Sequence, residues 1–546
     1  MTKLVLIAAT CLMACGPRAL SDHDGGAGDG GPTGGSHTLS SITVTPTNPI
    51  VELDLNTPGT QAFEVHAIYA DGADENVTAS ATLEIPGFTG VAVETSRIHA
   101  TYDSLEGDAQ ITVVAYRKTG ATTDFFFVLP YVDPAGEVTK PLDFGTAVPA
   151  LDVMFNMDTT GSMGGEISNL RSSLIGTVIP GIQSQVANSQ FGAASVRDFP
   201  LDPYGGSGDQ PFKLLQAITN NATAVQTAVN GMTAGGGNDT PEGQMEALYQ
   251  TATGEGLTTP SPTNIPAHTG GIGGVSFRAG TMPVIVSITD ALFHAPGEAR
   301  ACGAESSAYN GTVGAAAHTR AQTKTALENI CARSVGIATQ LSGDDECSGQ
   351  VDLEDFATAT GARVPPAAWD VSLPRPMGCG ATQCCTGVNG VGRATDDDGL
   401  CPLVFIADAN GSGVSTSIVT GIRMLARFAA FDVTSDRAGV TTSVDGVPLP
   451  APHTTADFIK QVTPTGFMLP PAPPVVPDPT FDATTFHGVT PGTRVQFDVR
   501  AFNDFVPQTD EAQIFRATLR VLAGGCTDLD QREVLILVPP TPIVLL

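Results

Sequence analysis

Basic residues are scarce in this chain. Its 546 residues include 26 Lys plus Arg against 56 Asp plus Glu, which gives a formal net charge of −30. Nucleic-acid binding needs a basic face that neutralises phosphates, so this composition argues against nucleic acid as a partner. A strongly acidic surface instead concentrates divalent cations, and it fits a soluble exported protein.

Several catalytic motifs are also missing. No lysine follows a glycine anywhere, so the chain has no Walker P-loop, and the GGSGD stretch at 205–209 does not fit the G-x-S-x-G hydrolase elbow. A hydrolase in the cysteine-rich region is the enzymatic alternative, but no nucleophile–base spacing supports it. We therefore expect a protein that is not an enzyme.

The N-terminus predicts export. Lys3 precedes an apolar run at 4–13 that is too short to span a bilayer, which indicates a signal peptide over residues 1–14. Its end, Leu-Met-Ala-Cys, resembles a bacterial lipobox with Cys15 as the lipidated residue; the alternative is an ordinary signal peptide with a chance cysteine. Gly16, in place of Asp, favours the outer membrane by analogy with lipoprotein sorting. The expected location is the bacterial outer membrane or cell surface, with the protein held to the membrane by a lipid anchor.

Cysteine usage agrees with export. The chain has ten cysteines, and two of them, Cys11 and Cys15, lie in or at the end of the predicted leader. The even number left predicts disulfides. Most of these cysteines lie between 302 and 401, which indicates stapled loops within one domain. A zinc site is the alternative, but no C-x-x-C spacing occurs. The pairing stays open. The eight remaining cysteines are Cys302, Cys331, Cys347, Cys379, Cys384, Cys385, Cys401 and Cys526.

Composition changes along the chain predict the domains. Residues 15–38 are rich in Gly and Asp and are expected to form a flexible tether. Residues 39–121 alternate apolar and polar positions between turn signals, as in an antiparallel sandwich. The segments VTPTNPIVEL, AFEVHAIY and GDAQITVVAY resemble bacterial Ig-like domains of the Big family. The family's usual tryptophan is absent, and Leu83 lies near its place.

From 149 to 435 the pattern changes to strands alternating with helices, which predicts a mostly parallel sheet with helices on both faces. Helices are expected at 163–186, 223–232 and 242–251, and another after an N-cap at Ser415. Residues 436–546 return to strands. We expect the strands of 122–148 to join them, so that the α/β domain is inserted in a β-sandwich. The predicted fold class is multidomain α/β plus β: a doubly wound, mostly parallel, Rossmann-like sheet with flanking antiparallel β-sandwich modules.

Three oxygen-rich places follow apolar strands in this domain. They are the D-T-T-G-S run at 158–162, the Gly-rich loop AGGGNDTPEG at 234–243, and Asp290 directly after VIVSIT. Sites in open parallel sheets form at the carboxyl ends of the strands. Hydroxyl and carboxylate oxygens are the ligands of hard divalent cations, so these places predict one cation site.

In this order, the three pieces resemble the metal-ion-dependent adhesion site of von Willebrand factor A (vWA) domains, over roughly 145–435. The matching positions are Asp158, Thr160, Ser162, Thr240 and Asp290, with Thr160 in place of the family's first serine. The resemblance implies bound Mg²⁺ or Ca²⁺, with Mn²⁺ also compatible. The hydroxyls would contact the ion directly and the aspartates partly through water. A carboxylate of a protein partner would fill the open position.

Each piece also has a purely structural alternative. Asp158 and Ser162 would cap the following helix, and Thr240 would cap a helix with Pro241 in its first turn. Asp239 and Glu242 are expected to be solvated helix-start acids, with tuning of the site's charge as the alternative.

Two further expectations concern residues outside the proposed site. His294 and Glu298 are expected at the surface, and Trp369 in the core. The alternative function is a structural cell-envelope assembly or spacer protein whose vWA domain binds partners independently of metal.

Overall fold

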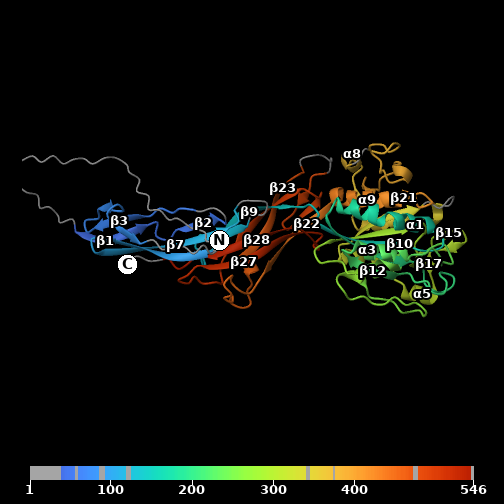
Figure 1. Ribbon diagram of the computed structural model, residues 1–546, viewed down its shortest axis with the longest axis horizontal. Coiled ribbons are helices and arrows are strands. Elements are labelled where there is room, and N and C mark those ends of the chain that lie inside the picture. Colours follow the sequence, from blue (N-terminus) through green and yellow to red (C-terminus); the bar gives the residue numbers. More distant parts are fainter. Residues whose placement is uncertain are drawn as a thin grey trace, which may run out of the picture.

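The computed structural model describes residues 38–542 apart from 56–58, 85–92, 119–123, 340–344, 373–374 and 471–476. The molecule is elongated (Figure 1). The N-terminal strands lie at one end, the α/β domain lies at the other, and the C-terminal strands lie between them. The predicted signal peptide, Cys15 and nearly all of the tether fall outside the described residues.

The N-terminal domain is a two-sheet sandwich. One sheet has the order β1-β3-β4 and the other β2-β7-β6-β5. Alternate side chains such as Ile42, Val44, Val65 and Ala67 are buried between them, as period-two patterning requires. One pair, β2 with β7, is parallel, which differs from the purely antiparallel expectation. The strands are β1 (Leu39–Thr45), β2 (Ile50–Asp54), β3 (Glu64–Tyr69), β4 (Asp74–Asn76), β5 (Thr82–Glu84), β6 (Val93–Tyr102) and β7 (Leu105–Tyr116).

The strands just before the α/β domain pair with strands that follow it. β8 (Phe125–Val128) is parallel to β28 (Thr527–Val538), and β9 (Val138–Gly145) is antiparallel to β26 (Arg494–Ala501). This is the pairing that the inserted arrangement predicts. The other strands here are β22 (Phe431–Gly439), β23 (Ile459–Met468), β24 (Thr480–Phe481), β25 (Thr485–Val489) and β27 (Gln513–Ala523).

The α/β domain is built on a six-stranded sheet of order β12-β11-β10-β13-β18-β21. All neighbours are parallel except β12, an antiparallel edge strand that the sequence did not reveal. β10 is buried at every position, which explains its nearly continuous apolar run. The strands are β10 (Ala150–Asp158), β11 (Asn188–Val196), β12 (Lys213–Thr219), β13 (Met282–Thr289), β18 (Arg333–Thr339) and β21 (Val404–Ala407).

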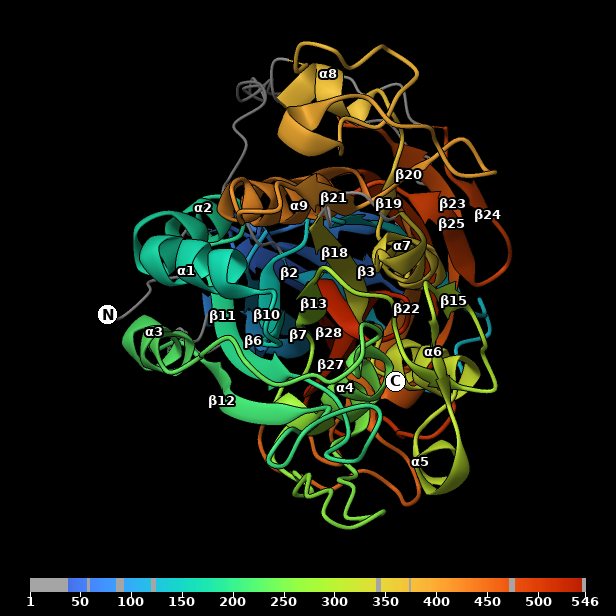
Figure 2. The ribbon, with the colours of Figure 1, turned by 90° about the vertical axis from the view of Figure 1, so that its right-hand side faces the viewer.

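Helices cover both faces of this sheet (Figure 2). One layer holds α1 (Gly164–Ser173), α2 (Ile179–Gln183), α3 (Ala222–Asn230) and α9 (Val414–Phe428), and the other holds α4 (Gln244–Thr253), α6 (Arg320–Asn329) and α7 (Gln350–Ala359). The helix expected at 163–186 is interrupted by a π-helical turn at Leu174–Val178, and Pro180 lies in the first turn of α2. The N-cap of α9 is Gly413; the expectation of Ser415 is wrong, because Ser415 lies inside the helix, where its N–H donates to Asn169 Oδ1.

The shorter elements lie mainly in the segments between these strands and helices. They are β14 (Ala295–Pro296), β15 (Ala301–Cys302), β16 (Glu305–Ser306), β17 (Ala308–Tyr309), α5 (Gly311–Ala316), β19 (Arg363–Val364), α8 (Ala368–Ser372) and β20 (Cys401–Pro402). Trp369 in α8 is 1% exposed, so the expected core position is confirmed.

All eight cysteines among the described residues form disulfides: Cys302–Cys347, Cys331–Cys526, Cys379–Cys385 and Cys384–Cys401. Three of them staple loops within the α/β domain, as expected. Cys331–Cys526 differs, because it joins the α/β domain to the turn before β28. Nearby, the N–H of Asp528 in β28 donates to Gly280 O (2.9 Å), so the start of β28 also contacts the segment just before β13.

The α/β domain shares a hydrophobic core with the C-terminal strands. One continuous hydrophobic core runs from residues such as Phe155 and Val284 into Phe497 and Phe515. β13 begins beside the junction between the α/β domain and the C-terminal strands, where Gly280 contacts Asp528, and it ends at Thr289. At about 3.3 Å per residue, the end of β13 lies roughly 25 Å away from it. The carboxyl edge of the sheet therefore faces away from the β-rich stalk, which is formed by the N-terminal sandwich and the C-terminal strands with β8 and β9.

Candidate metal centre

The end of β10 places Asp158 at the middle of this edge. Its side chain is fully buried, and both oxygens are engaged. Oδ1 accepts the N–H (2.9 Å) and hydroxyl (2.7 Å) of Thr160, and Oδ2 accepts the Thr289 hydroxyl (2.7 Å) and Gln244 Nε2 (2.8 Å). Three segments, the 158–162 loop, β13 and the start of α4, are thus held together through one carboxylate.

Asp290 lies next to this group. It follows β13 and is 5% exposed, and the exposed Ser162 side chain hydrogen-bonds to its carboxylate. A hydroxyl that donates its proton to a carboxylate keeps its lone pairs for another partner. Thr160 donates to Asp158 in this way, and Ser162 does the same for Asp290. Both hydroxyl oxygens are therefore suited to a cation.

Glu242 is also buried at this edge of the sheet, in contrast to the expectation from the sequence. It was expected to be a solvated acid at a helix start, but it is 3% exposed and α4 begins only at Gln244. Its Oε2 has no hydrogen-bond partner among the described residues. A Cβ built on Gly237 would lie 2.6 Å from Glu242 Oε1 and 3.3 Å from Thr160 Cγ2, so Glu242 extends alongside Thr160. The only sequence feature that could have indicated this position is the P-E-G run at 241–243, which directly follows the Gly-rich loop.

The helix-capping alternatives do not hold in the structure. α1 begins after Met163, without a side-chain cap, so neither Asp158 nor Ser162 caps it. α4 has Gly243 at its N-cap, so Thr240 does not cap it. The backbone N–H of Thr240 donates to Glu305 Oε2 (2.7 Å), and the role of its hydroxyl as a ligand stays a prediction.

The pKa values of these buried acids are raised. Burial, and then the neighbouring Asp290 carboxylate, raise the pKa of Asp158 to about 7. Burial also raises the pKa of Asp290. Burial followed by the charges of Asp158, Asp198, Asp239 and Asp290 raises the pKa of Glu242 well above its ordinary value. Within the described residues, none of Asp158, Glu242 and Asp290 forms an ion pair with Lys or Arg.

A divalent cation fits this donor set. The group offers only oxygen ligands, which Mg²⁺ and Ca²⁺ prefer. It also buries carboxylates without a compensating charge, and such burial is unfavourable unless a cation is bound. The unpartnered Oε2 of Glu242 is the feature that protein contacts alone do not explain.

A second group of side chains lies at the same edge. Asp198 follows β11, Asp239 belongs to the 234–243 loop, and His294 follows β13. His294 was expected at the surface, but it is 0% exposed, so that expectation is wrong. Glu298 is half-buried and pairs with Arg320. Asp239 was expected to be solvated, yet its side chain is only 9% exposed, and burial raises its pKa to about 7.

Comparisons with known proteins add a resemblance. No family model matches the chain, and no curated protein matches it. Among solved structures it is similar to a von Willebrand factor type A protein from Catenulispora acidiphila, with TM-score 0.30 and 10% identity over 78% of this chain and 76% of that one. It is also similar to the pilus adhesin SpaC from Lactobacillus rhamnosus GG, with TM-score 0.30 and 12% identity over 79% of this chain and 51% of that one.

A second crystal structure of SpaC, in an open conformation, gives TM-score 0.28 and 11% identity. This chain spans about half the length of SpaC. These TM-scores and identities are too low to carry an argument about function. The chemistry of the site therefore decides what it binds.

Proposed function

We propose that this chain is an exported binding protein whose α/β domain is a vWA domain carrying a divalent-cation site. Asp158, Thr160, Ser162, Thr240 and Asp290 would hold Mg²⁺ or Ca²⁺, and Glu242 joins them. The observation that carries the proposal is the convergence of three buried carboxylates, those of Asp158, Glu242 and Asp290, on two hydroxyls oriented by those acids.

The proposed role is binding without catalysis. The cation supplies an electrophilic centre for a partner's oxygen. The chain's residues do the rest: Asp158 and Asp290 orient the hydroxyls of Thr160 and Ser162, and Gln244 and Thr289 hold Asp158 in place. The exposed Ser162 marks the open side of the site.

The proposed partner group is a protein carboxylate. A chain with a net charge of −30 repels acidic partners, so a carboxylate needs a cation to bind here. The location of the site supports this role, because the edge faces away from the stalk. Binding would then depend on the metal, in contrast to an assembly or spacer role that persists without it.

The proposed setting is the cell surface. Four disulfides support an oxidising compartment. Within the described ranges, no helix combines the length and apolar character needed to cross a membrane. Attachment through a lipid on Cys15, in the outer membrane, remains part of the proposal.

Calorimetry of the metal-stripped protein with Mg²⁺ and Ca²⁺ tests the site: titration gives the affinity, and thermal unfolding gives the stabilisation. A cation at about 100 times its Kd should stabilise the wild type by about 2.7 kcal/mol. Asp158→Asn should abolish this gain, and Ser162→Ala should weaken the affinity about tenfold or more. Ser184→Ala is the matched control, because Ser184 is also an exposed serine, and its hydroxyl donates to Gly181 O and accepts from Gln185 Nε2, away from the site.

Partner dependence is tested by pull-down from envelope extracts with and without EDTA. The proposal expects capture that EDTA and Asp290→Asn both abolish. Capture that survives both would establish the metal-independent alternative. A wild type that Mg²⁺ and Ca²⁺ do not stabilise would end the cation mechanism itself.

A further inference from the structure

The second group at the carboxyl edge, formed by Asp198, Asp239 and His294, has the composition of a metal site. One possible ligand atom from each of the three residues lies within 4.8 Å of the other two. The residues come from three different segments, which follow β11, precede α4 and follow β13. One metal ion bound between them would therefore link these three segments.

The surroundings orient two of the three ligands. Asp198 Oδ1 accepts the Tyr309 hydroxyl (2.6 Å) and the Phe199 N–H (2.5 Å), and Asp198 Oδ2 lies 2.6 Å from His294 Nδ1. The His294 ring stacks on Tyr309 with 4.6 Å between centroids. Partners that fix a carboxylate and an imidazole in this way are typical of the shell around metal ligands.

A histidine–aspartate ion pair does not account for the whole group. The Nε2 atom of His294 already lies 3.1 Å from Ser306 O and is 3.5 Å from Asp239 Oδ2, which is too long for a good hydrogen bond. Oδ1 of Asp239 has no hydrogen-bond partner among the described residues, although the side chain is only 9% exposed. A buried carboxylate oxygen left in this state is costly, and a bound cation would remove that cost.

Glu242 connects this group to the first site. The charges of Asp198 and Asp239, as well as those of Asp158 and Asp290, raise the pKa of Glu242. The backbone of Glu242 also pairs with the segment after β13: its N–H donates to Leu292 O (2.8 Å), and its C=O accepts the His294 N–H (2.8 Å). The Glu242 side chain thus extends alongside Thr160 of the first site, while its backbone pairs with the segment that carries His294 of the second group.

We propose that Asp198, Asp239 and His294 form a second divalent-cation site beside the first, with Glu242 between the two. The imidazole selects the ion: mixed nitrogen and carboxylate ligands suit Zn²⁺ or Mn²⁺, whereas the all-oxygen first site suits Mg²⁺ or Ca²⁺. The second ion holds the 234–243 loop, and with it Glu242, against the strand ends. This proposal does not depend on the first site binding a partner.

Metal stoichiometry on the full, metal-stripped chain tests the proposal, with Mn²⁺ followed by electron paramagnetic resonance and Co²⁺ by its visible spectrum. Wild type should bind two Mn²⁺ ions per chain. His294→Gln should bind one and lose the Co²⁺ band of a nitrogen-ligated ion. Asp158→Asn should also bind one but keep that band. The two variants therefore report the two sites separately.

His487→Gln is the matched control. His487 also lies between two aspartates, 3.0 Å from Asp432 Oδ2 and 3.2 Å from Asp482 Oδ2, but its side chain is 43% exposed on the stalk. It should keep two ions. Loss of one ion in His487→Gln, with none lost in His294→Gln, would mean surface binding and would overturn the proposal.

Asp239→Asn covers the case in which His294→Gln fails to fold. This change leaves the Asp198–His294 pair intact, so circular dichroism should match wild type, while the second ion should bind about tenfold more weakly or worse. Binding of a single ion by wild type, or unchanged binding in Asp239→Asn, overturns the second site. Binding of one ion that only Asp158→Asn removes overturns it as well, while leaving the first site intact.

Discussion

At the scale of single residues, the candidate site depends on hydroxyls that donate their protons to neighbouring carboxylates and so keep their lone pairs for another partner. Thr160 donates its hydroxyl proton to Asp158, so its oxygen is left as an acceptor facing the site. Glycine makes the close approach of Glu242 feasible: Gly237 has φ +74°, and any side chain there would meet Glu242 Oε1. The loop's glycines are therefore part of the site's construction.

Gly237→Ala is expected to weaken Mg²⁺ binding about tenfold, because the added Cβ would lie 2.6 Å from Glu242 Oε1 and displace that carboxylate. Isothermal titration measures the effect. Gly208→Ala is the control, because Gly208 also has positive φ (+95°) but nothing lies within 4 Å of an added Cβ. Both variants carry a backbone cost of about 1 kcal/mol, and only the first should lose affinity. Equal affinities in the two variants would contradict the placement of Glu242.

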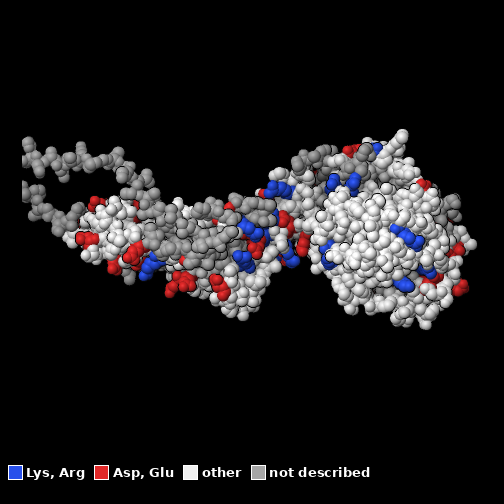
Figure 3. Space-filling view, in the orientation of Figure 1, with Lys and Arg blue, Asp and Glu red and all other residues white. Residues whose placement is uncertain are grey.

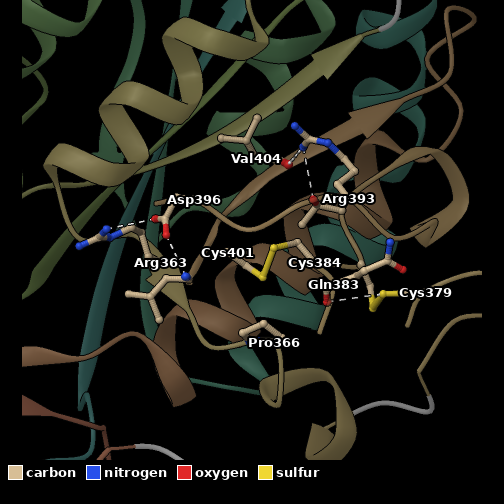
Figure 4. Close-up of a disulfide and its surroundings, with 12 residues drawn as sticks. Arg363, Pro366, Cys379, Gln383, Cys384, Arg393, Asp396, Cys401 and Val404 are labelled. Atoms are coloured by element: carbon tan, nitrogen blue, oxygen red, sulfur yellow. Dashed lines mark hydrogen bonds and ion pairs between the residues drawn. A yellow bond between two sulfur atoms is a disulfide. The ribbon is translucent and has the colours of Figure 1, made fainter. Parts of the chain in front are cut away.

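At the scale of elements, disulfides hold the insertion between β19 and β20. Cys384–Cys401 joins the insertion loop to β20 (Figure 4). Around it, the backbones of Cys384 and Arg393 pair in both directions (3.0 and 2.8 Å), and the Arg393 guanidinium donates to Val404 O (3.1 Å). Within the insertion, Trp369 is buried at 1% exposure, whereas Met377 is 95% exposed. Cross-links and polar contacts therefore hold the insertion together with this buried tryptophan.

Replacing both Cys384 and Cys401 with Ser should lower stability by about 3 kcal/mol, because the disulfide closes a loop between residues 17 positions apart. Replacing Cys379 and Cys385 should cost less, about 2 kcal/mol, since their separation is 6. Denaturant unfolding gives both values. Mg²⁺ affinity should stay within about twofold of wild type. A reversed order of the two losses would show that the disulfides act mainly through the folded state.

At the scale of the whole molecule, the candidate site is placed at the far side of a stalk. The α/β domain interrupts the β-sandwich, and its sheet is anchored there by a shared core and by Cys331–Cys526. On the face drawn in Figure 3, charged side chains are sparse over the α/β domain and gather along the stalk and the junction. The shared core and the disulfide hold the domain with the carboxyl edge of its sheet directed away from the C-terminal strands.

Replacing Cys331 and Cys526 with Ser should cause the largest loss among the four disulfides, about 5 kcal/mol, because the residues are 195 positions apart. The shared core should still hold the domains together, so limited proteolysis should cut the junction only slightly faster. Cation affinity should not change, because the site lies at the opposite end of β13. A loss smaller than that of the Cys384–Cys401 pair would contradict this expectation.

Much of the arrangement was present in the sequence. Apolar runs ending in Asp158 and Asp290 predicted buried parallel strands, and the strands at 122–148 were rightly expected to pair with those after 430. Local patterns suffice there, because strand burial and side-chain period are set by neighbouring residues. The same patterns brought Asp158, Thr160, Ser162 and Asp290 to one edge before any contact was known.

Other features were decided only by tertiary structure. His294, Asp239 and Glu242 look like surface residues in the sequence, because their partners are remote: Asp198 is 96 residues from His294, and the backbone of Glu242 pairs with Leu292 and His294. Cys331–Cys526 and the edge strand β12 likewise depend on segments meeting in space. The sequence alone thus determined which strands carry oxygen-bearing side chains at their ends. The tertiary structure decided which acids are buried together, because burial and charge proximity arise only when distant loops pack at one edge of the sheet.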